Sequence, residues 1–332
     1  MTFDQQLRAI VGAVAFAAPD RVRITNMRNA QREIVIAMQG NAFGGLTYAL
    51  YTDWYIALPS DPAPATAPTA SAASAAEFLA GLQAANPIPY RHEDGWTVTR
   101  ADASGAWIAN TMQQQRFAAL NEIVPLAGAL APGLPVRLVP LRGMVTGAGG
   151  HYLISGRPIL DPQAGRQVRF YWNVAADGAA AFLRDLGTRL ERRRIPFQAK
   201  VPVGPSLYAR TDAGVLYLND EDVEAAIDAV AATYQTLRSH LRPAVPLFTR
   251  ELAPGLAFAE SPPTRDSFGM HRCGLIAEGL LWAEQRGARE IEARLAIVRE
   301  RLTAYGLELD RLERNPTSRY PYRLDVPMER AA

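Results

Sequence analysis

Residues 167–174 read QVRFYWNV, and this stretch decides the fold class of the second half of the chain. Apolar side chains occupy one face of the pattern: Val168, Phe170, Trp172 and Val174. The opposite face carries Arg169 and Tyr171. Strands of this kind are typical of antiparallel sheets, since the strands of a parallel sheet are apolar on both faces. The sequence therefore predicts an α/β (α+β) fold, a predominantly antiparallel sheet with helices packed on its apolar face.

Two further stretches extend this strand pattern along the chain. Residues 195–203 alternate again, with Lys200 on the polar side. Residues 207–218, LYARTDAGVLYL, predict a third strand with Tyr208, Arg210 and Asp212 on one side. If the three strands share a sheet, they present a basic, tyrosine-containing face.

The first half of the chain has weaker patterns. Helices are expected over residues 3–16 and 46–55, and short strands over residues 96–99, 136–139 and 152–154. Between them, residues 59–76 lack bulky apolar side chains and predict a mobile Pro/Ala-rich loop. We therefore expect an N-terminal helical and mixed region over residues 1–150 and a second region over residues 151–332.

Composition excludes several classes of function. The 332 residues include 35 basic and 33 acidic ones, a net charge of +2, so we expect no nucleic-acid partner and no membrane partner. The apolar stretch over residues 11–18 is too short to cross a bilayer, and Asp4 argues against an export signal. Cys273 is the only cysteine, which excludes an internal disulfide and fits a cytoplasmic protein.

Familiar cofactor motifs are missing. The glycine-rich stretch GMVTGAGG, residues 143–150, lacks the Gly-Lys-Ser/Thr ending of a P-loop and predicts an ordinary loop. The four histidines and the cysteine have no metal-ligand spacing, and no G-x-S-x-G elbow occurs. We expect no metal and no organic cofactor.

Lys200 stands out because it is the only lysine among the 35 basic residues. A lysine ammonium can lose its proton when burial or neighbouring cations favour the neutral amine, whereas an arginine stays charged. Lys200 is therefore either a base or a surface lysine that survived by chance.

A helix start provides a second feature of interest. Residues 265–278, RDSFGMHRCGLIAE, predict a loop that enters a helix capped by Asp266 or Ser267. The N–H groups of a helix start favour an anion, and Arg272 follows in the first turn. Taken alone, this segment favours a surface ion pair of Arg272 with Glu278 or another acid over an anion site.

Four segments in order, RFYWNV, RRIPFQAKV, YARTDAGVLYL and SFGMHRCGLIAE, resemble the HopA-type effector family. That family includes type III effectors and the lyase components of class V lanthipeptide and thioamitide biosynthesis. The resemblance covers residues 152–282. It implies a metal-independent lyase that eliminates phosphate from phosphoserine or phosphothreonine of a ribosomal precursor peptide, giving dehydroalanine or dehydrobutyrine. A separate phosphotransferase, a kinase partner, would supply the phosphorylated peptide.

The order of elements is also similar to that of the effector phosphothreonine lyases, which implies roles for individual residues. Lys200 matches the base, and Arg169, Arg210 and Arg272 match phosphate ligands. Tyr217 and Ser267 complete the expected phosphate site. Tyr171 stands where those enzymes have a histidine acid, so the general acid is open between Tyr171, Tyr208 and His271.

Two other functions remain open from the sequence. A noncatalytic phosphopeptide-binding or effector-like protein would use the same basic face without turning its ligand over. A cyclase that adds thiols to dehydro residues is disfavoured, because zinc-ligand spacing is absent.

Overall fold

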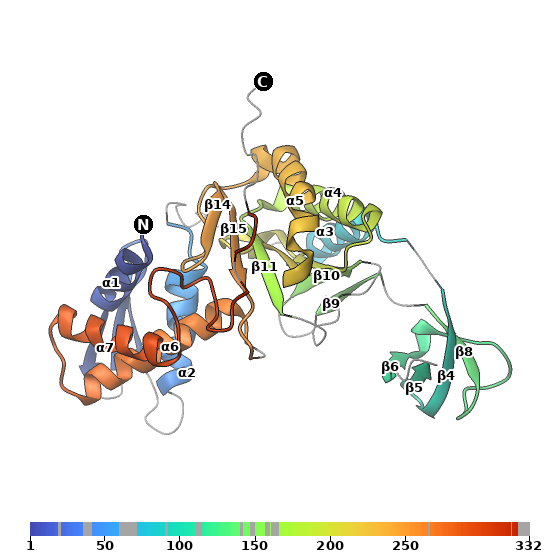
Figure 1. Ribbon diagram of the computed structural model, residues 1–332, viewed down its shortest axis with the longest axis horizontal. Helices are drawn as coiled ribbons and strands as arrows, with labels where there is room; N and C mark the ends of the chain where they lie inside the picture. The colour runs from blue at the N-terminus through green and yellow to red at the C-terminus, as the bar shows by residue number, and fades with distance from the viewer. Residues whose placement is uncertain are drawn as a thin grey trace.

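The structure is a computed structural model (Figure 1). It describes these residues: 1–18, 21–35, 42–59, 72–89, 92–110, 115–139, 142–146, 150–156, 160, 166–264, 266–319 and 321–324.

A seven-stranded antiparallel sheet forms the centre of the molecule, in the order β14-β15-β11-β13-β12-β10-β9. Its strands span these residues: β9 Gly143–Thr146, β10 His151–Ser155, β11 Gln167–Trp172, β12 Gln198–Pro202, β13 Gly214–Asn219, β14 Arg250–Ala253 and β15 Leu256–Glu260. Every pairing within it is antiparallel, which confirms the predicted fold class.

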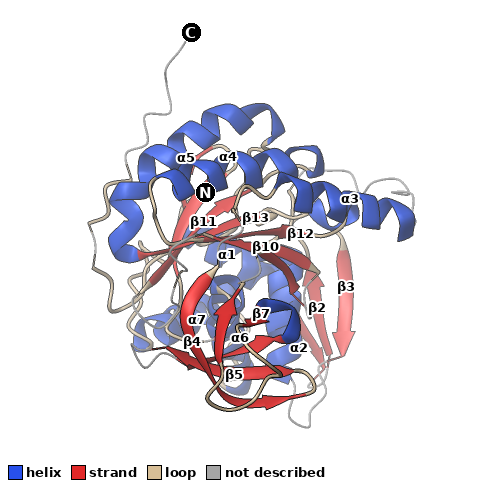
Figure 2. Cartoon of the chain, turned by 90° about the vertical axis from the view of Figure 1, so that its right-hand side faces the viewer, coloured by secondary structure: helices blue, strands red, loops and turns tan. Residues whose placement is uncertain are grey.

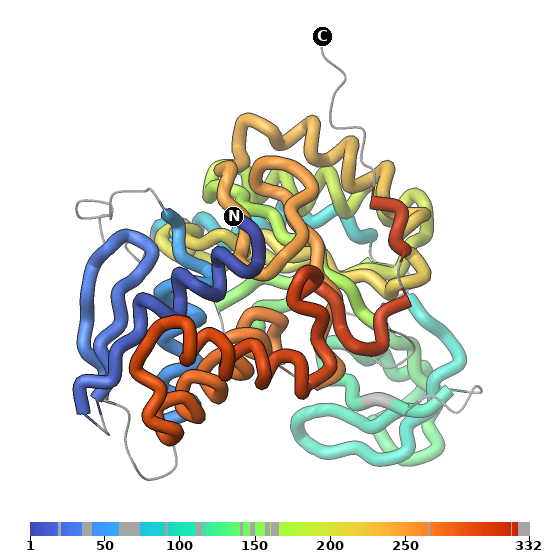
Figure 3. The backbone as a smooth tube through the Cα atoms, turned by 60° about the vertical axis from the view of Figure 1, so that its left-hand side comes forward, coloured from blue at the N-terminus to red at the C-terminus, as the bar shows by residue number. Residues whose placement is uncertain are grey.

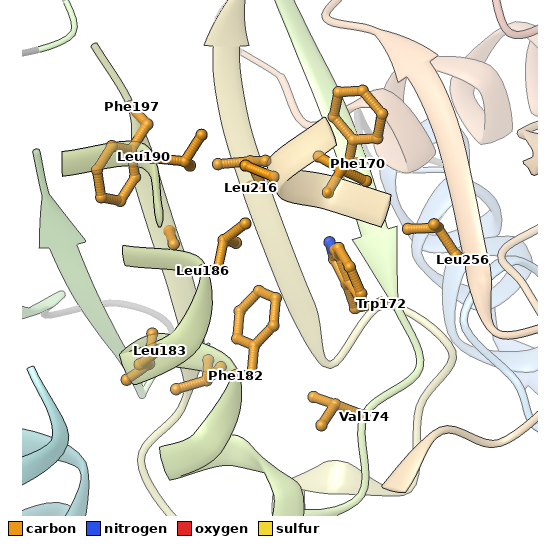
Figure 4. Close-up of a cluster of buried hydrophobic side chains, with 14 of the residues drawn as sticks. Phe170, Trp172, Val174, Phe182, Leu183, Leu186, Leu190, Phe197, Leu216 and Leu256 are labelled. Carbon is orange, nitrogen blue, oxygen red and sulfur yellow. The ribbon is translucent and has the colours of Figure 1, made fainter. Parts of the chain in front are cut away.

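Three helices pack on the apolar face of this sheet: α3 Ala72–Ala85, α4 Ala179–Arg192 and α5 Val223–Leu237 (Figure 2). Phe170 and Trp172 of β11 are fully buried against Phe182 and Leu186 of α4 (Figure 4). Burying each large apolar side chain contributes about 1.5 to 3 kcal/mol, so this layer holds the sheet in place. The face predicted to be apolar from residues 167–174 is the one that is buried.

Helices also cover part of the opposite face, which the sequence did not predict. This layer comprises α1 Phe3–Ala13, α2 Ala42–Leu50, the π-helical turn η1 Tyr51–Tyr55, α6 Phe268–Gln285 and α7 Ile291–Ala304. The N-terminal helix α1 packs here on α7 (Figure 3). A three-stranded sheet lies beside them, formed by β1 Val14–Ala18, β2 Arg21–Thr25 and β3 Gln31–Val35.

A third sheet of five strands, in the order β6-β5-β4-β8-β7, has its own small core around Trp96 and Ile108. Its strands are β4 Glu93–Asp102, β5 Gly105–Asn110, β6 Gln115–Ala119, β7 Ile123–Pro125 and β8 Pro135–Leu138. Residues 1–150 thus contribute to all three sheets.

Four local predictions need correction. The first helix ends at Ala13, because Val14 begins a strand that pairs with β2. Residues 72–76 of the expected loop are helical, and residues 60–71 lie outside the described residues. Residues 143–146 form strand β9 instead of a loop.

The fourth correction concerns the expected strand over residues 207–218. Only Gly214–Asn219 is a strand, because Pro205–Tyr208 forms a 3₁₀ turn with proline at its start. The chain then leaves the sheet, and the Thr211 amide donates to the carbonyl of Ile56 (N···O 2.9 Å).

Candidate functional site

Arg169 and Lys200 lie on the same face of the central sheet. Arg169 is paired across strands with Tyr217, and Lys200 is paired with Val215, two residues before Tyr217. Residues directly opposite each other in an antiparallel pair point to the same face, and so do residues two apart in one strand. Tyr171 belongs to this face as well, because it is paired with Val215.

Both cations lie over one aromatic ring. The guanidinium carbon of Arg169 is 5.3 Å from the ring centre of Tyr217, and the Lys200 Nζ is 5.7 Å from the same point. The face of an aromatic ring attracts cations, so Tyr217 stabilises both cations beside β13. Within the described part of the chain, no carboxylate lies within ion-pair distance of Lys200. Two cations gathered in this way form a site for an anion.

Arg169 is oriented by the segment that leads into α6. Its Nε donates to the hydroxyl of Ser261 (2.9 Å), and its Nη2 donates to the carbonyl of Asp266 (3.4 Å). These contacts use one edge of the guanidinium. The guanidinium also interacts with the phenol of Tyr171.

Arg210 reaches the same region from the turn before β13. Its Nη2 donates to Asp212 Oδ2 (3.0 Å) and to the hydroxyl of Tyr51 (2.8 Å). The pair is mostly buried, with 20% of the Arg210 side chain and 9% of the Asp212 side chain exposed. Although burial opposes it, the nearby Asp212 raises the pKa of Arg210 above its ordinary value. Arg210 therefore stays charged and is held in place by Asp212.

Tyr51 is a site residue that the sequence reasoning missed. It lies on η1, and its ring stacks on Tyr55 with 5.5 Å between ring centres. The aromatic-rich run YTDWY of residues 51–55 was a signal, but nothing in its spacing linked it to a strand more than a hundred residues later.

Tyr171 is almost fully buried beneath α6, and its ring lies 6.4 Å from that of Phe268. Burial raises the pKa of Tyr171 to about 12, with Arg169 acting in the opposite direction. Its phenol is therefore protonated at neutral pH, so it can donate a hydrogen bond. Among the three candidate acids, Tyr171 is the one on the same face as Lys200.

The structure does not place Tyr208 on that face. It belongs to the apolar core on the other side of the sheet, and its hydroxyl donates to the carbonyl of Pro202 (2.9 Å). The predicted strand parity was wrong for this residue, because residues 205–208 are a 3₁₀ turn.

The three predicted residues of α6 have local partners. Ser267 caps the helix, and its hydroxyl accepts from the amide of Met270 (3.2 Å). Arg272 is 1% exposed and donates to the carbonyls of Leu312 (2.8 Å) and Arg314 (2.7 Å). Its guanidinium also lies over the ring of Phe268, 4.7 Å from the ring centre. None of these partners of Arg272 belongs to the strands of the sheet.

His271 also faces this C-terminal segment. Its Nδ1 is 2.8 Å from Nη1 of Arg272, and its ring meets Tyr305 edge to face. Burial and the neighbouring guanidinium of Arg272 lower the pKa of His271 to about 4. The ring is therefore neutral at pH 7 and accepts a hydrogen bond there.

Three other features of the described residues bear on function. A cleft of about 750 Å³ lies between the start of α1 and residues 244–251, and none of the site residues named above lines it. None of the described helices combines the length and the apolar character needed to span a bilayer. No group of three or more His, Cys, Asp or Glu side chains in the described ranges is arranged to hold a metal ion.

One family model matches the part of the chain that carries six strands of the central sheet, β10 to β15. The model of the HopA1 effector protein family matches residues 148–314, which is half of the chain. The protein belongs to the HopA1 effector protein family.

Two solved structures of Pseudomonas syringae effector proteins are similar to this chain. The effector protein from pathovar tomato strain DC3000 is 19% identical, with a TM-score of 0.45, covering 84% of this chain and 92% of the other. The effector protein from pathovar syringae strain 61 is 15% identical, with a TM-score of 0.43, covering 80% and 87%. A search of curated proteins finds no match.

Proposed function

We propose that the protein is a lyase that eliminates phosphate from phosphoserine or phosphothreonine in a peptide. The observation that carries this proposal is the position of the only lysine, Lys200, beside Arg169 over the ring of Tyr217. A site for this reaction needs an amine base next to cations that hold the leaving group. Membership of the HopA1 effector protein family is compatible with the proposed lyase activity and was established independently of that activity.

In the proposed reaction, the neutral amine of Lys200 removes the α-proton of the phosphorylated residue. The electrons of the broken C–H bond form the Cα–Cβ double bond, and the Cβ–O bond breaks with its electron pair on the phosphate oxygen. The products are an ammonium, a dehydro residue and a phosphate anion. Atoms and electrons balance without a metal, an oxidant or a reductant.

Arg169 and Arg210 are the proposed phosphate ligands. Arginine recognises phosphate through paired N–H groups, and the charge that develops on the leaving group is stabilised by fixed cations. For Arg210 to bind phosphate, its pairing with Asp212 and Tyr51 must allow part of the guanidinium to face the ligand. Tyr51 and Asp212 then serve to position Arg210.

Tyr171 is the proposed hydrogen-bond donor to the leaving phosphate. Its phenol is protonated at neutral pH, and it shares the face of Lys200. Phosphate leaves as an anion, so neutralising its charge matters more than protonating it. Loss of the Tyr171 hydroxyl should therefore slow the reaction less than loss of Arg169.

The proposed substrate is a phosphorylated ribosomal precursor peptide, and a separate phosphotransferase would have to supply it. In the competing function, the same cations hold a phosphopeptide without turning it over, as a noncatalytic effector-like protein would.

Mass spectrometry separates these functions. Phosphothreonine and phosphoserine peptides are incubated with the purified protein at neutral pH and with chelator present. A lyase gives peptides that have lost phosphoric acid and that react with an added thiol. A phosphatase gives a restored hydroxyl that does not react, and a binding protein leaves the peptide unchanged. An unchanged peptide that nevertheless binds tightly would establish the noncatalytic function.

A further inference from the structure

Helices cover only one half of the sheet face that carries Lys200. The apolar cluster beneath α2 and α6 includes Tyr171, Val215 and Ala257, but within the described ranges it contains no residue of β9, β10 or β12. Leu153, Gln198 and Lys200 are accordingly half-buried. Among the residues that the structure describes, helices cover this face on the side of β11 and not on the side of β9.

A row of side chains crosses this open half. Lys200 is paired across strands with Leu153, and Leu153 is paired with Met144 of the edge strand β9. Direct partners share a face, so all three side chains point the same way. Met144 at the end of the row is 49% exposed.

We propose that this row, Lys200, Leu153 and Met144, binds the residues on one flank of the phosphorylated residue and selects apolar side chains there. This inference rests on the proposed function, which identifies the ligand as a phosphopeptide. Two observations favour this occupant. The row is continuous with Lys200, and the cations Arg169 and Lys200 complement a phosphate at that end. The apolar surface of Leu153 and Met144 extends outward from there.

Strand spacing sets which peptide positions are selected. Neighbouring strands lie about 4.8 Å apart, so Leu153 is about 5 Å and Met144 about 10 Å from the line of Lys200. An extended peptide advances about 3.3 Å per residue. Leu153 therefore contacts the first or second residue from the phosphorylated one, and Met144 contacts about the third. The other flank meets the edge of the α2 and α6 layer, so selectivity is one-sided.

The edge strand offers a matched control for the test. Val145 follows Met144, is 46% exposed and is paired with Tyr152, so it points to the opposite face. Met144→Thr and Val145→Thr remove similar apolar surface from the two faces of the same strand. Both threonines suit an edge strand, so both variants should fold.

The experiment uses fluorescent phosphothreonine peptides in which a leucine is moved through three positions on either side, with serine elsewhere. Binding is measured by anisotropy with the otherwise intact Lys200→Arg variant, which keeps the cation, and turnover is measured with Lys200 present. We expect leucine at the third position on one flank to improve binding about tenfold, as partial burial of that side chain implies. Met144→Thr should abolish this preference and Val145→Thr should keep it.

Three outcomes test whether the row selects apolar residues on one flank. Equal preference on both flanks, or a preference that Met144→Thr leaves intact, overturns the inference even if elimination is observed. A one-sided preference that depends on Met144, without any elimination, supports the binding row and rejects the proposed lyase activity. Loss of the leucine preference in Val145→Thr as well would overturn the inference, because the preference would then depend on the whole of strand β9 and not on the face that carries Met144.

Discussion

Arg169 and Lys200 share the ring of Tyr217, at 5.3 Å and 5.7 Å from its centre, although they come from strands separated by β13. The ring attracts each of the two cations, which offsets part of the repulsion between them. A dianionic phosphate would offset the rest. The arrangement thus favours an occupied state of the site.

Replacing Lys200 by arginine should abolish elimination and leave phosphopeptide binding within about threefold of wild type. A guanidinium keeps the charge but cannot accept a proton at neutral pH. Elimination is followed by mass spectrometry and binding by anisotropy. If Lys200→Arg retained more than about a tenth of wild-type turnover, a barrier change below about 1.4 kcal/mol, then Lys200 could not be the base.

Tyr217 should matter through its ring and not through its hydroxyl. Tyr217→Leu removes a cation–π contact from both Arg169 and Lys200, each contributing about 0.5 to 1 kcal/mol at a partly exposed site. We expect binding of a phosphopeptide to weaken about five- to thirtyfold by anisotropy. Tyr217→Phe is the control and should bind as wild type does. A comparable loss in Tyr217→Phe would show that the hydroxyl contacts the ligand.

Arg272 should contribute to stability more than to phosphate binding. Arg272→Met leaves the carbonyls of Leu312 and Arg314 without their buried donor, which costs roughly 2 to 4 kcal/mol. The melting temperature should fall by roughly 4 to 8 °C. Arg286→Met, which breaks an exposed ion pair with Glu300, should shift it by less than about 1 °C. An unchanged melting temperature with weakened phosphopeptide binding would instead assign Arg272 to the phosphate.

The low pKa of His271 predicts a loss of stability in mild acid. In the unfolded chain a histidine takes up its proton near pH 6.5, whereas folded His271 does so only near pH 4. The unfolded state therefore binds the proton first, and stability present above pH 6.5 is lost as the pH falls toward 4. The loss is on the order of 1 to 3 kcal/mol.

Denaturant unfolding at several pH values measures this effect. His271→Gln lacks the titrating ring, so its stability should fall less than that of wild type between pH 6.5 and 4.5. Parallel curves for the two proteins would show that His271 does not contribute to the pH dependence.

Alternation in residues 167–174 and 195–203 was sufficient to predict an antiparallel sheet and, on the condition that both strands belong to it, to place Arg169 and Lys200 on one face, because side-chain parity is a local property of a strand. Parity failed for Tyr208, where a proline-initiated turn replaced the expected strand. Tyr51 could not be found at all, because only packing of η1 brings it to Arg210. Local patterns report the direction of a side chain, whereas partners from distant elements depend on tertiary contacts.

The five-stranded sheet is inserted between α3 and β9, and the chain leaves and re-enters the main body at one point. Asn86 Nδ2 donates to the carbonyl of Arg142 (3.0 Å), and Arg142 Nη1 donates to the carbonyl of Ile88 (3.2 Å). Closing a flexible loop of about fifty residues would cost about 3 to 4 kcal/mol in chain entropy. The interactions within the inserted sheet offset this entropy, because the pairing of Glu93 with Leu138 already brings the two ends of the insertion together. Once the insertion has folded, the start of β9 is held close to the end of α3, so the insertion should accelerate the docking of α3 on the central sheet.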